Sequence, residues 1–185
     1  RRGDGEGTLA HLLWPVGVDQ FLAEVLERRP MVVSRGGAGS GGPGGFYGGL
    51  MSCDDIKSWL ARGMKYGLNV DVTSYAGGVR HTHNSDGGGG GGAGCQHGEV
   101  ADGGVVWRRF EREGCSLRVL HPQRWSDPLY QTLASLEGFF RCSTGCNTYL
   151  TPHSSQGFAP HWDDIDAFVL QLEGSKRWRG YAPAS

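Results

Sequence analysis

A histidine and a carboxylate separated by one residue stand near the C-terminal end of the sequence. His161 and Asp163 are i and i+2, so on a β-strand both side chains would point to the same side. One imidazole and one carboxylate are part of a 2-His-1-carboxylate site, which binds Fe(II) and leaves positions open for a cosubstrate and O₂. The pair alone is a weak signal, because a His-x-Asp spacing is found by chance in many chains.

A lysine and two polar side chains could complete an anion site beside this pair. A strand over residues 167–172, a turn and a returning strand over 176–181 would bring Lys176 back beside the apolar interior. An unpaired ammonium is costly to bury there, and a dicarboxylate cosubstrate could neutralise it. Asn147 and Tyr149 would share a strand face and could donate hydrogen bonds to the same guest. The alternative is that Lys176 flanks a hairpin turn in solvent, as most lysines do.

Other residues with metal or charge chemistry give weaker signals. Arg118 lies among apolar neighbours, so it either extends its charge to solvent from a strand edge or directs it into a pocket. His81 and His83 would share a strand face, but no carboxylate stands beside them, which disfavours a metal site. The 5 cysteines are too sparse for a disulfide framework and favour reduced thiols without structural zinc.

The composition argues against two broad classes of partner. The chain of 185 residues carries 18 basic and 19 acidic side chains, a formal net charge of −1, so no electrostatic case exists for nucleic acid or an anionic membrane. Its apolar runs are too short to span a bilayer. Glycine is abundant, at 33 residues, and clusters at about 36–49 and 86–94, where we expect flexible Gly-rich loop insertions. Neither cluster has the Lys-Ser/Thr of a phosphate-binding loop.

Helices and short strands must position these side chains. Apolar periodicity and capping residues predict helices over 18–29, from 53 to about 62, from about 103 to 113, and from 127 to 140. Strands are predicted at 31–33, 68–75, 79–82, 115–120, 147–150, 160–163, 167–172 and 176–181. Because helices come first and strands crowd at the end, the pattern indicates an α+β fold that leads into a β-barrel or jelly roll.

Several blocks of the chain resemble the JmjC-type ribosomal oxygenases. They are NTYLTP at 147–152, SQGFAPHWDD at 155–164 and AFVLQLEGSKRWR at 167–179, and the similarity extends back through 115–123 and 68–75 and weakly to LWPV at 13–16. The chain is most similar to the nucleolar histidyl-hydroxylase branch, which is also described as a histone lysine demethylase. The resemblance implies a double-stranded β-helix, the cupin-like JmjC jelly roll, with N-terminal helices and with Fe(II) and 2-oxoglutarate as cofactor and cosubstrate.

The resemblance implies a role for each candidate residue that matches a functional position of the family. His161 and Asp163 match the first two iron ligands of the family. Lys176 matches the residue that pairs with the distal carboxylate of 2-oxoglutarate, and Asn147 and Tyr149 match its other polar contacts.

Arg118 matches an arginine near the substrate channel, which makes substrate binding its expected role. Trp162 replaces the tyrosine usual between the two ligands, and we expect it to face away from the metal. The family's second iron histidine lies well downstream of the His-x-Asp pair, and no earlier histidine matches it. We therefore expect residues 1–185 to form a single incomplete JmjC domain, an N-terminal fragment whose parent dimerises through a C-terminal region.

The resemblance implies a 2-oxoglutarate-dependent dioxygenase that hydroxylates a histidine of a ribosomal protein. Demethylation of a histone methyl-lysine is an alternative with the same chemistry, which would make the parent a chromatin regulator. A non-catalytic cupin-like binding protein is a further alternative. The expected location is the nucleus, most specifically the nucleolus, with no direct nucleic-acid or membrane binding.

Overall fold

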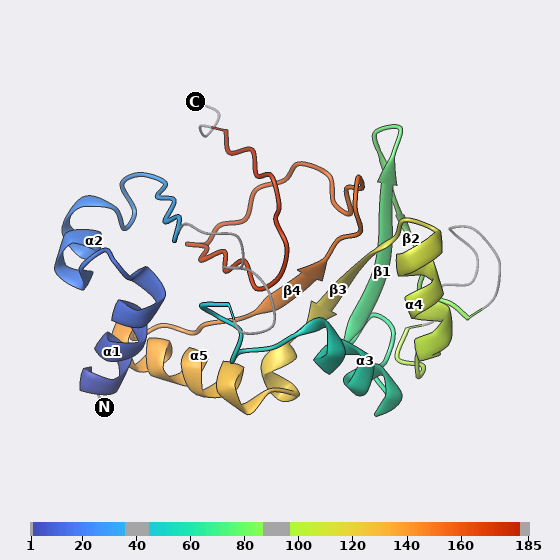
Figure 1. Cartoon of the computed structure of the whole chain (residues 1–185), viewed down its shortest axis with the longest axis horizontal. Helices are drawn as coiled ribbons and strands as arrows, with labels where there is room; N and C mark the ends of the chain where they lie inside the picture. The colour runs from blue at the N-terminus through green and yellow to red at the C-terminus, as the bar shows by residue number, and fades with distance from the viewer. Residues whose placement is uncertain (1, 36–44, 87–96, 182–185) are drawn as a thin grey trace.

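Helices cover one face of an antiparallel sheet, and an irregular C-terminal segment covers the other, in the computed structural model of the protein (Figure 1). The structure describes residues 2–35, 45–86 and 97–181. The helices are α1 (Arg2–Leu13), α2 (Val18–Glu24), α3 (Cys53–Ala61), α4 (Gly103–Arg112), the 3-10 helix η1 (Pro122–Arg124) and α5 (Asp127–Phe140). The strands are β1 (Val70–Ala76), β2 (Val79–Thr82), β3 (Ser116–Leu120) and β4 (Asn147–Leu150).

Side-chain capping sets where the predicted helices begin. Ser52 and Asp55 form a reciprocal capping box at α3: the Ser52 hydroxyl accepts from the Asp55 N–H, and the Asp55 carboxylate accepts from the Ser52 N–H at 2.8 Å. Asp102 caps α4, and Ser126 caps α5 by accepting from the N–H of Leu129. Each cap satisfies backbone donors that the first helical turn leaves unpaired.

The 4-stranded sheet has the order β2-β1-β3-β4, and every neighbouring pair is antiparallel. Because side chains alternate along a strand, each strand contributes to two different faces. One face is apolar and packs against α3 and α4 through Val70, Val72, Leu117 and Val119. The other face is polar and carries Asp71, Thr73, Ser116, Arg118 and Tyr149. We call this second surface the polar face.

A second apolar cluster joins the N-terminal helices to α5. It contains Leu9, Leu12 and Leu13 from α1, Phe21 and Val25 at α2, and Leu136 from α5. Leu172 packs against this cluster and against the core under the sheet. The end of the chain is thereby attached to both apolar clusters.

The N-terminal part departs from the sequence prediction in three ways. Helix α1 was not predicted. The helix predicted over 18–29 ends at Glu24, and Glu27 adopts a left-handed conformation with φ of 56°. The strand predicted at 31–33 does not form, and these residues pair with no described segment. The apolar stripe that favoured a longer helix is still used, because Val25 packs in the second cluster.

The strands predicted at 160–163, 167–172 and 176–181 are absent: the described residues after β4 form an irregular segment. A strand needs a hydrogen-bonded neighbour, and this segment has none within the described residues. Side chains hold it instead. The Glu173 carboxylate accepts from the N–H of Cys53 at 2.9 Å, at the positive end of the α3 dipole. This contact places the turn that precedes Lys176.

Most of the two Gly-rich segments, residues 36–44 and 87–96, lies outside the described residues. Residues 45–49 form turns in which Tyr47 is buried and its hydroxyl donates to the Leu12 carbonyl at 2.9 Å. The described cysteines, Cys53, Cys115, Cys142 and Cys146, are free thiols, as predicted. No helix in the described ranges is long and apolar enough to cross a membrane.

Replacing Gly5 tests the contact between α1 and α5. A Cβ at this position would lie 2.5 Å from the Ser135 carbonyl oxygen and 2.8 Å from the Phe139 Cβ. Gly5→Ala should therefore lower the free energy of unfolding by about 1–3 kcal/mol, measured by urea denaturation. Gly7→Ala on the same helix is the control: nothing lies within 4 Å of its added Cβ, so it should stabilise by about 0.5–1 kcal/mol. Equal effects at both positions would contradict the close contact.

Candidate functional site

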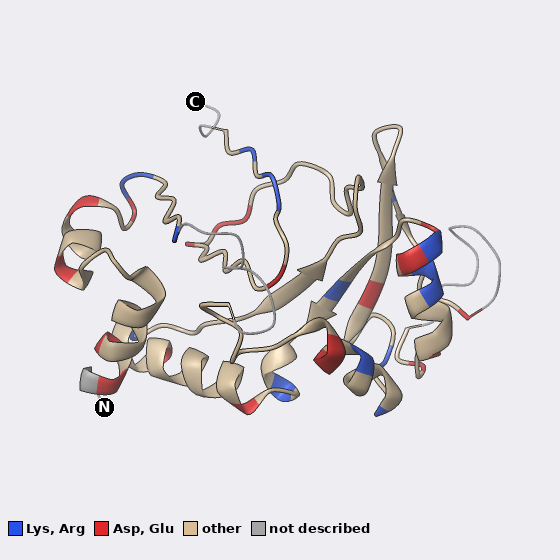
Figure 2. Ribbon diagram, in the orientation of Figure 1, with Lys and Arg blue, Asp and Glu red and all other residues tan. Residues whose placement is uncertain are grey.

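Asp71, Arg118 and Tyr149 lie in one row across the polar face. The register pairs Asp71 with Arg118 and Arg118 with Tyr149. The buried Asp71 carboxylate accepts from the Arg118 guanidinium, through Nε at 3.1 Å and through Nη2, and from the Asn84 amide at 2.7 Å. Figure 2 shows the acidic residue on β1 beside the basic residue on β3. Arg118 is therefore neutralised and fixed in direction by a residue on the neighbouring strand.

The irregular segment covers this row at Gly157 and Phe158. The Thr73 hydroxyl donates to the Gly157 carbonyl at 3.2 Å. A Cβ at Gly157 would lie 2.4 Å from the Ser116 Cβ, so only glycine allows the backbone to approach the sheet this closely. The contact brings the residues after Gly157 over the polar face.

The half-buried ring of Phe158 lies beside three of the six candidate residues, Arg118, Tyr149 and His161, and beside Arg80. Tyr149 meets it edge to face, with ring centroids 5.1 Å apart, and the His161 ring lies at 6.4 Å. The guanidinium carbons of Arg80 and Arg118 lie 4.7 Å and 5.5 Å from its centroid. Edge-to-face and cation–π contacts of this kind each contribute about 0.5–1.5 kcal/mol. Phe158 thus connects the arginines, the predicted cosubstrate residue Tyr149 and the predicted metal ligand His161.

Lys176 reaches the same region from the end of the segment, although its predicted strand does not form. Its ammonium donates to the Thr151 hydroxyl at 3.1 Å and lies 5.8 Å from the Tyr149 ring and 5.2 Å from the Trp178 ring. Burial of the ammonium lowers the pKa of Lys176, even though the residue as a whole is exposed. No carboxylate among the described residues pairs with it. A bound anion would offset the free-energy cost of burying this charge.

His161 and Asp163 face each other without a strand to align them. The His161 Nε2 lies 3.7 Å from the Asp163 Oδ2. The Nδ1 atom lies 2.8 Å from the Ala159 carbonyl oxygen, which can only accept, so Nδ1 is the donor. In the neutral ring this leaves the Nε2 lone pair directed toward the carboxylate, and a backbone contact of this kind orients many metal-bound histidines.

The donor set fits part of an iron site. Two atoms bound to one octahedral ion at about 2.1 Å lie roughly 3.0 Å apart, so a movement of under ~1 Å would let His161 and Asp163 share an ion. Among the residues that the structure describes, no group of three or more His, Cys, Asp or Glu side chains is arranged to hold a metal. The described residues thus supply two of the expected ligands.

Asn147 begins β4 opposite Leu120. Because it is two residues before Tyr149 on a regular strand, both side chains point to the polar face, as predicted. Asn147 is exposed and Tyr149 is 39% exposed. Both are open to a small polar guest.

His81 and His83 do not form a second metal centre within the described part of the chain. Their rings are 6.4 Å apart, and the His83 Nε2 is 2.8 Å from the Ser74 hydroxyl. Burial, and secondarily the charge of Arg109, lower the pKa of His83. Arg109 also donates to the His83 carbonyl, so this histidine joins β2 to α4.

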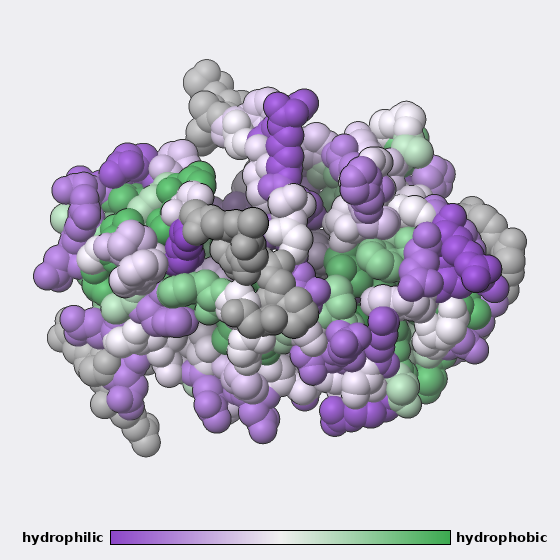
Figure 3. All heavy atoms as spheres, viewed as in Figure 1, coloured by the Kyte–Doolittle hydropathy of each residue, from purple (hydrophilic) through white to green (hydrophobic). Residues whose placement is uncertain are grey.

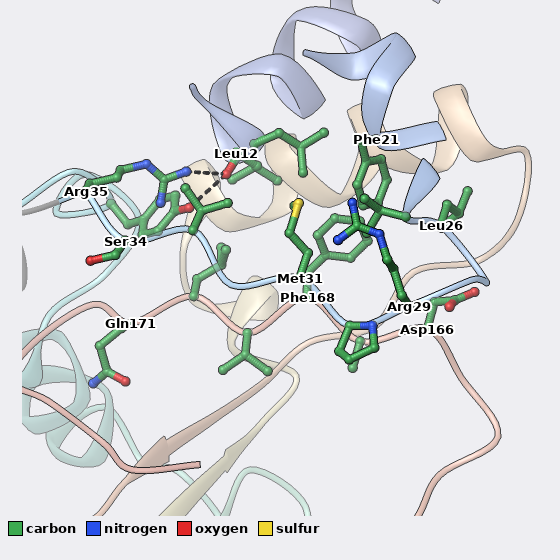
Figure 4. A pocket seen from close by; sticks show the side chains of 18 of the residues that line it. Leu12, Phe21, Leu26, Arg29, Met31, Ser34, Arg35, Asp166, Phe168 and Gln171 are labelled. Atoms are coloured by element: carbon green, nitrogen blue, oxygen red, sulfur yellow. Dashed lines mark hydrogen bonds between the residues drawn. The ribbon is translucent and has the colours of Figure 1, made fainter. Parts of the chain in front are cut away.

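A groove of about 620 Å³ lies elsewhere, between the N-terminal helices and the segment over 166–171 (Figure 4). Figure 4 shows Met31 and Phe168 in it, with Arg29 and Asp166 toward one end. Figure 3 shows hydrophobic surface at the upper left, where α2 and the residues after it lie. The lining includes none of the candidate site residues, so the groove is separate from the polar face.

Four residues that organise the site were not predicted from the sequence: Asp71, Thr151, Gly157 and Phe158. Asp71 had a usable signal, because a carboxylate inside an alternating Val-x-Val strand must point opposite to the valines. Thr151, Gly157 and Phe158 had none, since their contacts join residues far apart in the chain.

Comparison with known proteins confirms the resemblance. Residues 118–185 match the family described as JmjC domain. The chain is 44% identical over 173 residues to "Ribosomal oxygenase 1" of Gallus gallus, which covers 93% of the chain and 26% of that relative. It is 43% identical over 175 residues to "Bifunctional lysine-specific demethylase and histidyl-hydroxylase NO66" of Culex quinquefasciatus, with 92% and 24% covered. The chain spans about a quarter of the length of the curated relatives it matches.

Removing the carboxylate of Asp71 tests the ion pair under the site. Asp71→Asn leaves the Arg118 guanidinium without its counter-charge, and the free energy of unfolding should fall by about 2–3 kcal/mol. Asp54→Asn is the matched control, since Asp54 is 91% exposed and pairs with Lys57 on the surface of α3. We expect a loss below about 1 kcal/mol there. Denaturant unfolding that gives the same small loss for both variants would show that the ion pair is not structural.

Proposed function

Because residues 118–185 match the JmjC domain and most of the chain is similar to ribosomal oxygenases, we propose that the parent protein is an Fe(II)- and 2-oxoglutarate-dependent dioxygenase. We propose further that its fold is the double-stranded β-helix of the JmjC jelly roll, with the polar face turned toward the inside. The observation that supports this best is the convergence around Tyr149 and Phe158. Two groups reach that place: the ammonium of Lys176, which no carboxylate of the described residues pairs with, and the facing imidazole–carboxylate pair of His161 and Asp163.

The iron would be held by the Nε2 atom of His161 and the carboxylate of Asp163. When bound, Fe(II) would allow O₂ to serve as the oxidant of an unactivated C–H bond, with 2-oxoglutarate as the co-reductant that leaves as succinate and CO₂. The chain's own contribution is to orient the ligands. The Ala159 carbonyl fixes the His161 tautomer, and the Phe158 ring lies beside the imidazole.

The cosubstrate would bind between β4 and the end of the irregular segment. Lys176 pairs with its distal carboxylate, and Asn147 and Tyr149 donate hydrogen bonds to it from one strand face. The Trp178 ring beside the Lys176 ammonium limits access of water on that side. Loss of water strengthens the ammonium–carboxylate attraction.

The proposed substrate is a histidine in a ribosomal protein. Relatives carry the names ribosomal oxygenase and histidyl-hydroxylase, which support this choice. A histone methyl-lysine is the second candidate, because the name of the Culex relative also includes lysine-specific demethylase. The proposed location is the nucleus, with the nucleolus as its specific part, and the proposed assembly is a homodimer. A non-catalytic cupin-like protein is less well supported, since both metal donors and Lys176 are present.

Substitution of His161 tests the enzyme proposal. The full-length protein with Fe(II) should convert 2-oxoglutarate to succinate in the presence of a ribosomal-protein peptide, and His161→Ala should reduce this to background. His153→Ala is the control, since His153 is an exposed histidine of the same segment. If the wild-type protein produces no succinate with any such peptide, and His161→Ala changes nothing, the proposal is wrong.

Lys176 should control the affinity for 2-oxoglutarate. Lys176→Met should raise the KM for 2-oxoglutarate about tenfold or more, because a charge-assisted contact is lost. The expected pH dependence follows from the lowered pKa of Lys176. The ammonium is fully charged below that pKa, so binding is strongest there and weakens as the pH rises through it, before an ordinary lysine would titrate.

Two variants sharpen this test by isothermal titration with 2-oxoglutarate. Lys176→Arg keeps its charge at all accessible pH values, so any affinity it retains should not fall at alkaline pH. Lys65→Met, an exposed lysine between α3 and β1, should leave the affinity unchanged. An alkaline decline that persists in Lys176→Arg would assign the titration to another group.

A further inference from the structure

Arg80 brings a second guanidinium to the polar face, from the outer strand of the sheet. It pairs in register with Tyr75 on β1, and alternation from there places it on the same face as Thr73 and Asp71. Its side chain is exposed, and its guanidinium carbon lies 4.7 Å from the Phe158 centroid. Arg80 therefore stands at the rim of the face, with one side against an aromatic ring.

Among the described residues, the charges on the polar face leave Arg80 as a cation without a counter-charge. Arg118 is neutralised by Asp71. Lys176 would be neutralised by the distal carboxylate of 2-oxoglutarate. Arg80 has no carboxylate within ion-pairing distance in the described part of the chain. With metal ligands and cosubstrate in place, the guanidinium of Arg80 would be the cation of the described polar face that still lacks an anionic partner.

We propose that Arg80, held by Phe158, forms a subsite for an acidic side chain of the polypeptide substrate. The inference rests on the proposed function and deepens it by adding a specificity-determining residue. The exposed Arg80 guanidinium, whose central carbon lies over the Phe158 ring, presents N–H donors that can match a carboxylate with two parallel hydrogen bonds. Phe158 is the positioning residue: it fixes the direction of Arg80 and also contacts Tyr149 and His161.

A peptide carboxylate fits this subsite better than a nucleic-acid phosphate. Phosphate backbones are bound by stripes of several basic residues. Figure 2 shows acidic and basic residues mixed over the molecule, and the net charge of the chain is −1. A single directed guanidinium beside the site instead suits recognition of one acidic residue near the modified one.

Binding of paired peptides to the full-length protein tests the subsite. The probes are fluorescein-labelled, histidine-centred peptides in which one glutamate is moved along the sequence, each with a glutamine counterpart. Fluorescence anisotropy should find at least one glutamate position that binds the wild-type protein more tightly than its glutamine counterpart. Arg80→Ala should weaken that glutamate peptide about tenfold or more and leave its glutamine counterpart nearly unchanged, since a hydrogen bond to a charged group is lost.

Further variants separate the subsite from general damage. Arg112→Ala, an exposed arginine at the end of α4 that the polar face does not include, should bind both peptides like the wild type. Phe158→Leu should reduce the preference for glutamate, and Phe158→Tyr, which keeps the ring, should restore it. A structural role alone would weaken both peptides of a pair equally.

Two results would overturn the inference: no glutamate position preferred by the wild-type protein, or equal losses for both peptides in Arg80→Ala. Failure of the subsite can be told apart from failure of the proposed function, because the anisotropy assay measures peptide binding and does not depend on catalysis. A wild-type protein that makes succinate but shows no glutamate preference would refute only the subsite. One that shows an Arg80-dependent preference but makes no succinate would refute only the oxygenase.

Discussion

The ion pair between Asp71 and Arg118 is the interaction on which the polar face depends. Asp71 is 5% exposed, so its charge is kept in the interior by the guanidinium and the Asn84 amide. Such a buried ion pair adds little net stability compared with well-packed apolar residues in the same place. It does make any strand pairing that separates the two charges costly, because each charge would then be buried without a partner. A slip of one residue between β1 and β3 would turn Arg118 into the apolar core and leave both charges unpaired. The pair therefore fixes the register of β1 against β3, and the backbone pairing of β3 with β4 sets Tyr149 beside Arg118.

Local chemistry made part of the fold predictable. Ser52 with Asp55, and Ser126 with Pro128, identify helix starts because capping depends on a few adjacent residues. The same is true of the turn at 77–78, where both glycines adopt positive φ. Helix α1 could not be predicted, since Gly5 and Gly7 disfavour a helix locally. It forms through tertiary contact, and the missing Cβ of Gly5 permits the close approach to α5.

The strands predicted after residue 150 could not be predicted reliably from local sequence. Residues 167–172 have the β-branched and aromatic composition of a strand, but that composition specifies a surface that fits a sheet, not the sheet itself. The segment keeps the apolar contacts expected of such a strand, through Leu170 and Leu172, and lacks the ladder. Likewise, the i, i+2 spacing of His161 and Asp163 predicted a common direction from strand geometry. The two side chains do approach each other, at 3.7 Å, although no strand forms at 161–163.

The two halves of the candidate site consequently have different supports. Tyr149 and Arg118 stand on paired strands, so hydrogen-bonded register fixes their positions. Within the described residues, His161 stands on no paired strand and is oriented by the Ala159 carbonyl, the Asp163 carboxylate and the ring of Phe158. Phe158 in turn rests on Tyr149 and Arg118, and Arg118 is directed by Asp71. The direction of the His161 imidazole thus depends, through the Phe158 ring and Arg118, on the buried carboxylate of Asp71. The polar face therefore supports both halves of the candidate site.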